Sequence, residues 1–331
     1  MDAIAPSPLS MGVELTSEAD VCSICHGEFH GRNVVPVNLN PKCQTHCGHY
    51  FHLDCITGQF VDEPIGSRRC KLCRQNPIPL LNINTGKSYP DKFFPDQMFR
   101  SACCSGDLQQ VQKLLAEGVY INAVMNAGFT ALMIASSEGV TDLAELLIRH
   151  GADVNAARAE DGVTALFFAA KNNDIDITRL LIGAGADLNT PRTSDGATPL
   201  AIAVQEGCTE CARLLIYAGA DINAALSSGM TLLYIAALRG NTDCVELLLN
   251  AGLDPNDASS IGITPLYIAA LKGNTDCVKR LINAGADLNA RTRNGSTPLS
   301  IATRMGNTDC VKVLIATGKS QEAKERRGVL Q

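Results

Sequence analysis

Nine residues near the N-terminus, CGHYFHLDC from Cys47 to Cys55, contain two cysteines and two histidines. Five of the six histidines of the chain lie between residues 26 and 52, and seven of its 14 cysteines precede residue 75. Thiolate sulfur and imidazole nitrogen are the ligands that structural zinc takes in proteins. This local enrichment therefore predicts metal binding near the N-terminus.

Eight of these side chains have the spacing of zinc ligands. Two CxxC pairs, one CxH pair and one HxxC pair can each supply two ligands from a short turn, and a tetrahedral zinc ion takes four. Eight ligands therefore suit two closed structural sites without an open position for a hydrolytic water. The eight residues are Cys22, Cys25, Cys47, His49, His52, Cys55, Cys70 and Cys73.

Over about residues 21–75 this series resembles the RING finger family in its two-histidine variant. The resemblance implies two structural zinc ions with interleaved ligand sets, namely Cys22, Cys25, His52 and Cys55 for one ion, and Cys47, His49, Cys70 and Cys73 for the other. Two such ions can replace the core that so short a segment cannot build. A register through Cys43 and His46 competes with this assignment but leaves Cys47 without a role. A PHD finger is the nearest zinc rival and resembles the sequence less.

The RING resemblance implies a ubiquitin ligase that binds a ubiquitin-conjugating enzyme carrying ubiquitin and positions the thioester, without a covalent intermediate of its own. Ile24 matches the apolar contact of the family with the conjugating enzyme, and Leu72 lies at a further contact position. Arg74, directly after the last ligand, matches the cation that hydrogen-bonds ubiquitin and the conjugating enzyme. The chain departs from the family at Gln59, where Trp is frequent, and at Lys71, where Pro is frequent. These departures favour an alternative function, a non-enzymatic scaffold or adaptor with a structural zinc module.

The rest of the chain is a tandem repeat. A threonine recurs every 33 or 34 residues in segments such as GVTAL and GITPL, and segments of the type GADLN keep step with it. Over about residues 97–318 the sequence resembles the ankyrin repeat family, with seven repeats as the natural count. The recurring threonines are Thr130, Thr164, Thr198, Thr231, Thr264 and Thr297.

One repeat predicts two short helices. Thr264 is a good N-cap, Pro265 suits the first helical position, and Gly273 suits the left-handed residue that ends a helix. Thr275 and Asp276 then begin a second helix, with an acid facing the positive end of the helix dipole. Because one helix pair cannot bury both of its apolar faces, we expect the repeats to stack into a solenoid.

We expect the stacked repeats to bind an as yet unknown protein substrate. Tyr234 and Leu238, with Tyr267 and Leu271 one repeat later, would share the concave side if the geometry of the ankyrin family applies, and they could anchor a partner. The alternative is that both tyrosines are packing residues, and the hairpin tips are equally plausible contacts. Four cysteines that recur at one repeat position are predicted to pack in the core: Cys211, Cys244, Cys277 and Cys310.

Composition bounds the remaining functions. The net charge is −6 and the chain has no Trp, so we expect no nucleic-acid partner. Neither a secretory signal nor a membrane span is apparent, and clustered cysteines fit a reducing compartment, so we expect a cytoplasmic protein, in a host cytosol if a microbe delivers it. The expected organisation is multidomain: a disordered N-terminal tail (1–20), a RING-type zinc domain (21–75), a linker (76–97), an all-α ankyrin-repeat solenoid with β-hairpin turns (98–318) and a charged C-terminal tail (319–331).

Overall fold

The computed structural model describes residues 42–45, 49–52, 56, 60, 68–70, 72–82, 88–89 and 97–328. The chain divides into two compact units, which are Met1–Ser101 with Lys113–Ala127 and Ala102–Gln112 with Gly128–Gln331. No helix within the described ranges is long and apolar enough to cross a membrane.

The described part of the first unit contains a small antiparallel sheet. Strand β1 (Lys42–Gln44) pairs with β2 (Tyr50–His52) and with β3 (Leu80–Asn82), and β3 pairs with β4 (Ser88–Tyr89). The strand order is therefore β2-β1-β3-β4. Cys43 in β1 lies opposite Phe51 in β2, and both side chains are fully buried.

The core of the first unit is a small cluster of buried apolar side chains drawn from the strands and the segments between them. Tyr120 packs against this cluster from residues that follow the third helix. Cys43, the cysteine outside the predicted ligand series, is thus a core residue of the central strand. The cluster consists of Cys43, Phe51, Ile56, Phe60, Cys70 and Leu80.

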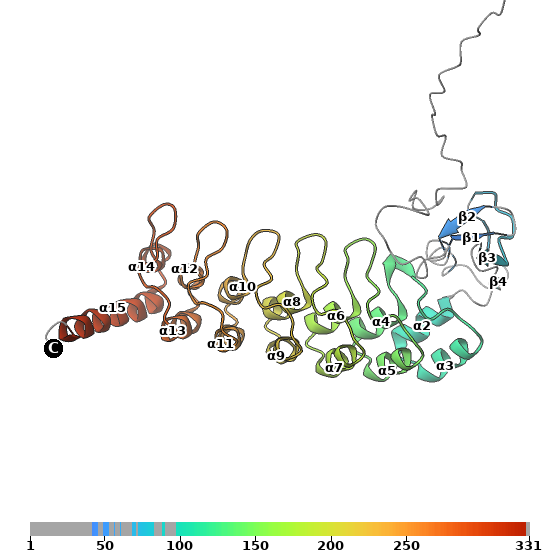
Figure 1. The fold of residues 1–331 in the computed structure, drawn as a ribbon, viewed down its shortest axis with the longest axis horizontal. Coiled ribbons are helices and arrows are strands. Elements are labelled where there is room, and N and C mark those ends of the chain that lie inside the picture. The colour runs from blue at the N-terminus through green and yellow to red at the C-terminus, as the bar shows by residue number, and fades with distance from the viewer. Residues whose placement is uncertain are drawn as a thin grey trace, which may run out of the picture. The chain divides into compact units, whose positions relative to one another are not determined.

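The described residues from 97 onward form seven helix pairs and one 3-10 turn, drawn in Figure 1. The pairs are α2 (Gln97–Ser105) with α3 (Leu108–Ala116), α4 (Ala131–Glu138) with α5 (Thr141–Arg149), α6 (Ala165–Lys171) with α7 (Ile175–Gly183), α8 (Pro199–Glu206) with α9 (Thr209–Tyr217), α10 (Leu232–Arg239) with α11 (Thr242–Asn250), α12 (Pro265–Lys272) with α13 (Thr275–Asn283), and α14 (Pro298–Met305) with α15 (Thr308–Gly328). The 3-10 turn η3 is Asn126–Gly128. Helix α15 continues ten residues beyond the expected boundary at residue 318.

The ends of the helices follow the local sequence. The hydroxyl of Thr264 accepts a hydrogen bond from the backbone N–H of Tyr267 at 3.2 Å, which caps α12. Gly273 ends α12 with φ 77°, and its N–H donates to the carbonyl of Ala269. At the corresponding place after α6 the left-handed residue is Asn173, with φ 57°. The predicted caps and stops are therefore confirmed.

Helices α4 to α15 form two layers, which we call the array. In Figure 1 the even-numbered helices of the array make an inner layer next to the hairpins, and the odd-numbered helices make an outer layer. Within each layer a helix packs against the corresponding helix of the next repeat. Most side chains of the inner helices α4 to α12 are buried, whereas in the terminal helix α14 only Pro298, Ile301 and Ala302 are buried.

Side chains of the recurring GNTDC segment join adjacent repeats. The side-chain amide of Asn274 donates to the carbonyl oxygens of Ala237 and Leu238 in the preceding repeat, at 2.8 and 3.4 Å. The hydroxyl of Thr275 lies 3.3 Å from the sulfur of Cys310 in the following repeat. Both contacts recur in neighbouring repeats, so the segment is an inter-repeat connector as well as a helix start.

The expected β-hairpin turns are confirmed in part, because the described loops of the array are hairpin-shaped but contain no named strand. Within these described loops, β-type pairing is limited to one isolated bridge between Ala157 and Thr164. The reason is that the hydrogen bonds close tight turns at glycine instead of extending a ladder: Gly162 donates to the carbonyl of Arg158 at 2.8 Å and has φ 72°.

Candidate metal centre and partner surface

The predicted ligands Cys70 and Cys73 share one tight turn. The N–H of Arg74 donates to the carbonyl of Cys70 at 2.7 Å, and the N–H of Cys70 donates to the carbonyl of Gln75 at 2.9 Å. Arg74 adopts a left-handed conformation with φ 60°, which reverses the chain directly after Cys73. The turn brings two thiol side chains to the same side, as a CxxC metal turn requires.

The loop between β1 and β2 carries His49. The buried Thr45 closes this loop, because its backbone N–H donates to the carbonyl of His49 at 2.9 Å and its hydroxyl accepts from the N–H of His49 at 2.9 Å. Gln44 and Tyr50, the strand residues on either side of this loop, are paired with each other between β1 and β2. His49 is thereby held at a fixed point beside the strands.

His49, Cys70 and Cys73 converge, with one donor atom of each within 4.8 Å of the others. The sulfur of Cys70 lies 3.6 Å from Nδ1 of His49. Bonds of about 2.3 Å to sulfur and about 2.0 Å to nitrogen, at a tetrahedral angle, place two ligand atoms about 3.5 Å apart. The separation of Cys70 from His49 matches this value, and Cys73 lies within 4.8 Å of both, so the three residues could hold a zinc ion. The predicted fourth ligand, Cys47, lies outside the described residues.

The second predicted ligand set is represented in the structure by His52. Its backbone belongs to β2 and pairs in register with Lys42. The remaining three members, Cys22, Cys25 and Cys55, lie outside the described residues, so this set stays a prediction.

Two predicted contact residues for a conjugating enzyme are exposed beside the converging ligands. Leu72 is 51% exposed, and Arg74 is exposed as well. Ile24, Gln59 and Lys71 lie outside the described residues. The exposed pair therefore forms the described part of this predicted contact surface.

Phe60, which follows Gln59 in the sequence, is a buried packing residue and does not offer an aromatic ring at the surface. Its side chain is 1% exposed, and the guanidinium carbon of the equally buried Arg68 lies 5.4 Å from its ring centroid. The ring faces the core cluster and a cation at once, which is a packing role. A partner would therefore meet Leu72 and Arg74 without help from this aromatic ring.

The two tyrosines of the predicted substrate patch, Tyr234 and Tyr267, are buried. Tyr234 and Tyr267 are each 8% exposed, and burial raises the pKa of Tyr234. The hydroxyl of Tyr267 donates to the hydroxyl of Ser296 at 3.4 Å, so this ring packs under the next hairpin. Leu238 and Leu271 are half-buried and remain accessible along one edge. The tyrosines are packing residues, which was the alternative interpretation.

The cysteines of the array are also packing residues. Cys211, Cys244, Cys277 and Cys310 are buried, and each sulfur lies 3.3 to 3.5 Å from a threonine hydroxyl of the preceding repeat. The sequence pattern indicated burial, but the threonine partners were missed because they lie 33 to 35 residues away. Burial raises the pKa of Cys103 to about 12, which excludes this thiol as a nucleophile near neutral pH.

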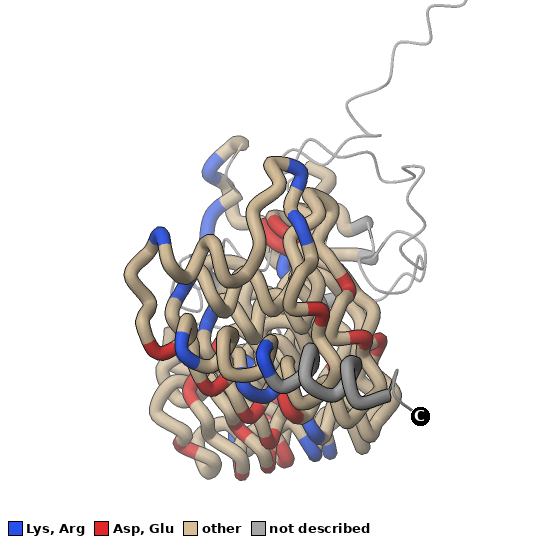
Figure 2. Tube along the Cα trace, turned by 90° about the vertical axis from the view of Figure 1, so that its left-hand side faces the viewer, with Lys and Arg blue, Asp and Glu red and all other residues tan. Residues whose placement is uncertain are grey.

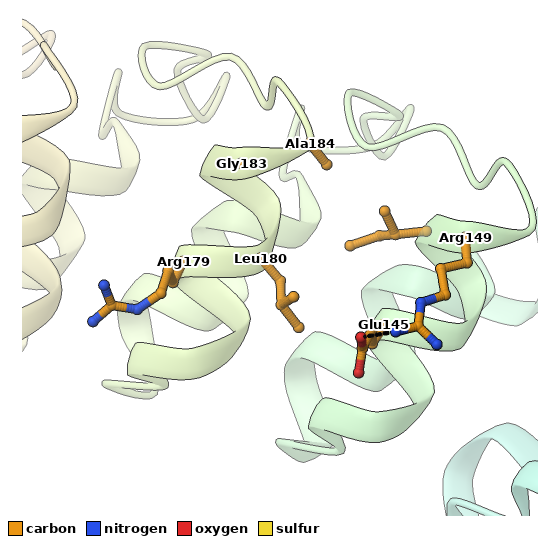
Figure 3. Close-up of a pocket in the computed structure, with 7 residues that line it drawn as sticks. Glu145, Arg149, Arg179, Leu180, Gly183 and Ala184 are labelled. Atoms are coloured by element: carbon orange, nitrogen blue, oxygen red, sulfur yellow. Dashed lines mark hydrogen bonds and ion pairs between the residues drawn. The ribbon is translucent and has the colours of Figure 1, made fainter.

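A groove of about 340 Å³ runs between the outer helices α5 and α7 (Figure 3). Glu145 and Arg149 form an ion pair on one side, and Arg179 and Leu180 lie on the other. Gly183, which also lines the groove, corresponds to the exposed Tyr217 one repeat later. The groove contains no nucleophile with a neighbouring base, so it has the character of a surface groove.

Comparison with known proteins agrees with this architecture. A model of ankyrin repeats (3 copies) matches the chain over residues 99–192, 189–259 and 233–325. The crystal structure of the human ASB11 ankyrin repeat domain is similar, with a TM-score of 0.59 and 27% identity over 66% of this chain and 96% of that domain. The inactive serine/threonine-protein kinase TEX14 of Bos taurus is 42% identical over 50 residues, so the match spans 15% of this chain and 3% of that relative.

The three matched stretches run from residue 99 to residue 325, which is more than half of the chain. The same residues carry the helix pairs, the threonine caps and the inter-repeat asparagines described above. Ankyrin repeats are protein interaction modules, and the array has their stacked construction. The chain belongs to the ankyrin repeat family.

Proposed function

We propose that this chain is a RING-type ubiquitin ligase, whose zinc domain recruits a ubiquitin-charged conjugating enzyme and whose ankyrin repeats bind a protein substrate. The observation that supports the proposal most directly is the convergence of His49, Cys70 and Cys73 within 4.8 Å. The RING resemblance assigns these three residues to one zinc ion, although 20 residues separate His49 from Cys70 in the sequence. Clustered cysteine ligands also fit a reducing cytosol, which is where we propose that the protein acts.

The proposed zinc ions would stabilise the fold and would take no part in ubiquitin transfer. Leu72 would bury its exposed side chain on the conjugating enzyme, together with Ile24, and so remove apolar surface from water. Arg74 would donate hydrogen bonds from its planar guanidinium to ubiquitin and to the conjugating enzyme at once. Restricting the conjugate in this way raises the effective concentration of the arrangement that a substrate lysine attacks.

The experiment is an in vitro ubiquitination assay of zinc-loaded protein with a panel of conjugating enzymes. Leu72→Ala and Arg74→Ala should each lower product formation at least about tenfold, with zinc content unchanged. Leu81→Ala is the matched control, because Leu81 in β3 is a comparably exposed leucine (43%) outside the CxxC turn. This control should retain full activity.

Two outcomes would contradict the proposal, the first its assigned contact residues and the second the ligase activity itself. Equal loss of activity in Leu72→Ala and in Leu81→Ala would show that any exposed leucine of this unit matters equally. The loss would then not report a specific contact of Leu72 with the conjugating enzyme. Silence of the folded, zinc-loaded protein across the whole panel would favour the scaffold, in which the zinc module is structural alone.

A further inference from the structure

The arginines of the early hairpins of the array are neutralised by neighbouring acids. Arg158 lies 3.0 Å from Glu160 and 3.4 Å from Asp161. Arg192 lies 2.5 Å from Asp195, whose carboxylate holds the pKa of the guanidinium above its ordinary value. Each guanidinium also lies over a phenylalanine ring, at 4.5 and 5.2 Å from the ring centroid. These cations are therefore occupied within the array.

The arginines of the last hairpin have a different environment. Arg291 and Arg293 are exposed, and their guanidinium groups donate to the carbonyl oxygens of Gly295 and Ser260 at 3.5 and 3.2 Å. No ion pair between described residues includes either arginine. Their charges are thus available to a partner.

Three more exposed cations lie at the ends of the last three inner helices. Arg239 ends α10, Lys272 ends α12, and Arg304 lies one position earlier in α14. No ion pair in the described part of the chain includes them. A cation at this place favours the helix dipole, but Glu138 and Glu206 occupy the equivalent ends of α4 and α8, so the fold does not require one.

The spacing between the cations on successive inner helices indicates how far apart the acidic groups of a ligand should lie. Packed helices lie about 8 to 10 Å apart, and an extended chain advances about 3.3 Å per residue. Cations on successive inner helices therefore match every third residue of an extended segment. Leu238 and Leu271, half-buried beside them, offer apolar contacts between the charges. Figure 2, viewed from the end that carries α14 and α15, shows Lys and Arg around the hairpins and the left-hand side of the tube.

We propose that the C-terminal basic surface binds an extended protein segment that carries an acidic side chain at about every third residue. A protein ligand fits better than a nucleic acid, because the chain as a whole has a net charge of −6 and the surface presents no aromatic ring for stacking. The inference names the chemistry of the partner for the repeats and rests on the substrate-binding role proposed above. The surface consists of the inner-helix cations Arg239, Lys272 and Arg304, and the hairpin that precedes α14 adds Arg291 and Arg293.

The test measures peptide binding to the full chain by fluorescence anisotropy, without any component of the ubiquitin system, so it can fail independently of the ligase. The probe is a fluorescein-labelled synthetic peptide with glutamate at every third position and with serine and alanine between. The variant R239E/K272E/R304E should weaken binding of this peptide at least about tenfold. A glutamine version of the peptide should not bind.

The matched control is R213E/K279E/K312E, which changes the net charge equally on the outer helices, where each cation already pairs with an acid. It should bind the peptide within about twofold of the wild type, and circular dichroism melts should show both variants folded. A second variant, R291S/R293S, alters a hairpin tip without touching a helix and should weaken binding about threefold.

Four results would overturn the inference. They are no binding of the glutamate peptide by the wild type, equal binding of the glutamine peptide, equal loss in the inner-surface and control variants, and tighter binding of a single-stranded oligonucleotide of the same charge. The last result would assign the surface to nucleic acid instead of protein.

Discussion

The first unit and the array are stabilised in different ways. In the first unit the buried cluster is small, and one of its members, Cys70, belongs also to the group of converging ligands. In the array every repeat contributes buried side chains, and its neighbours cover them. With the proposed zinc bound, the first unit would depend on a few specific donor atoms, whereas the stability of the array is spread over many equivalent contacts.

The largest expected effect follows from removing a ligand in the first unit. Cys70→Ala should unfold this unit, because structural zinc contributes about 10 to 16 kcal/mol of apparent binding free energy in small zinc folds. The array should keep its helical circular dichroism signal. Limited proteolysis and zinc content check the prediction, with Cys104→Ala as the control, since Cys104 is an exposed cysteine outside the cluster. Unchanged protease resistance in Cys70→Ala would contradict the dependence on metal.

The next effect compares one residue type at equivalent positions of two repeats. Leu266 is fully buried between neighbours, whereas Leu299, 33 residues later in the last repeat, is 36% exposed. Leu266→Ala should lower the free energy of unfolding by about 2 to 5 kcal/mol, through lost burial and the cavity left behind. Leu299→Ala should cost only about 1 to 2 kcal/mol, since its partly exposed side chain loses less buried apolar area. Urea denaturation measures both, and equal costs would mean that stacking does not set the stability.

Local features of the array could be predicted from the sequence because they depend on neighbours in the chain. Thr264 and Gly273 cap and end a helix through hydrogen bonds within a few residues, and both roles were predicted. The partner of the Cys310 sulfur could not be, since Thr275 lies 35 residues earlier and faces it only when repeats stack. The burial of Tyr267 has the same cause, because Ser296 of the next hairpin covers its hydroxyl.

The ligand cluster of the first unit was predictable in a different way. Spacing alone identified the residue types, but the pairing of His49 with Cys70 required a family resemblance, because nothing local connects them. The hydrogen bonds of Thr45 that fix His49 left no signal in the sequence. In a tandem repeat the same helix caps and turns recur in every unit, so the pattern can be read from the sequence several times. The ligand spacing of the first unit occurs once, so its pairing cannot be checked against a second copy.

A smaller effect tests the asparagine connectors. Asn274→Ala removes two hydrogen bonds to carbonyl oxygens of the preceding repeat and should cost about 1 to 3 kcal/mol, because it leaves these acceptors without their donor. Asn283→Ala, at an exposed position that ends α13, is the matched control and should change stability by less than about 0.5 kcal/mol. Native-state hydrogen exchange at α10 and α12 should report the difference. The same exchange rates in both variants would show that the connectors add nothing to stacking.

The last effect, which is absent near neutral pH, separates the two uses of cysteine. A zinc-bound thiol must be deprotonated, whereas the buried Cys103 thiol is held protonated, with a pKa of about 12. Because the folded pKa is raised, the stabilising contribution of Cys103 is complete below the unfolded pKa of about 9 and is lost as the pH rises toward 12.

At pH 8 iodoacetamide should modify the exposed Cys104 and spare Cys103, while Cys70 and Cys73 should react after chelation of zinc. Mass spectrometry reads all four sites. Equal labelling of Cys103 and Cys104 in the native protein would show that burial in helix α2 does not control thiol reactivity. Labelling of Cys70 and Cys73 before chelation would show that no bound zinc protects these two thiols.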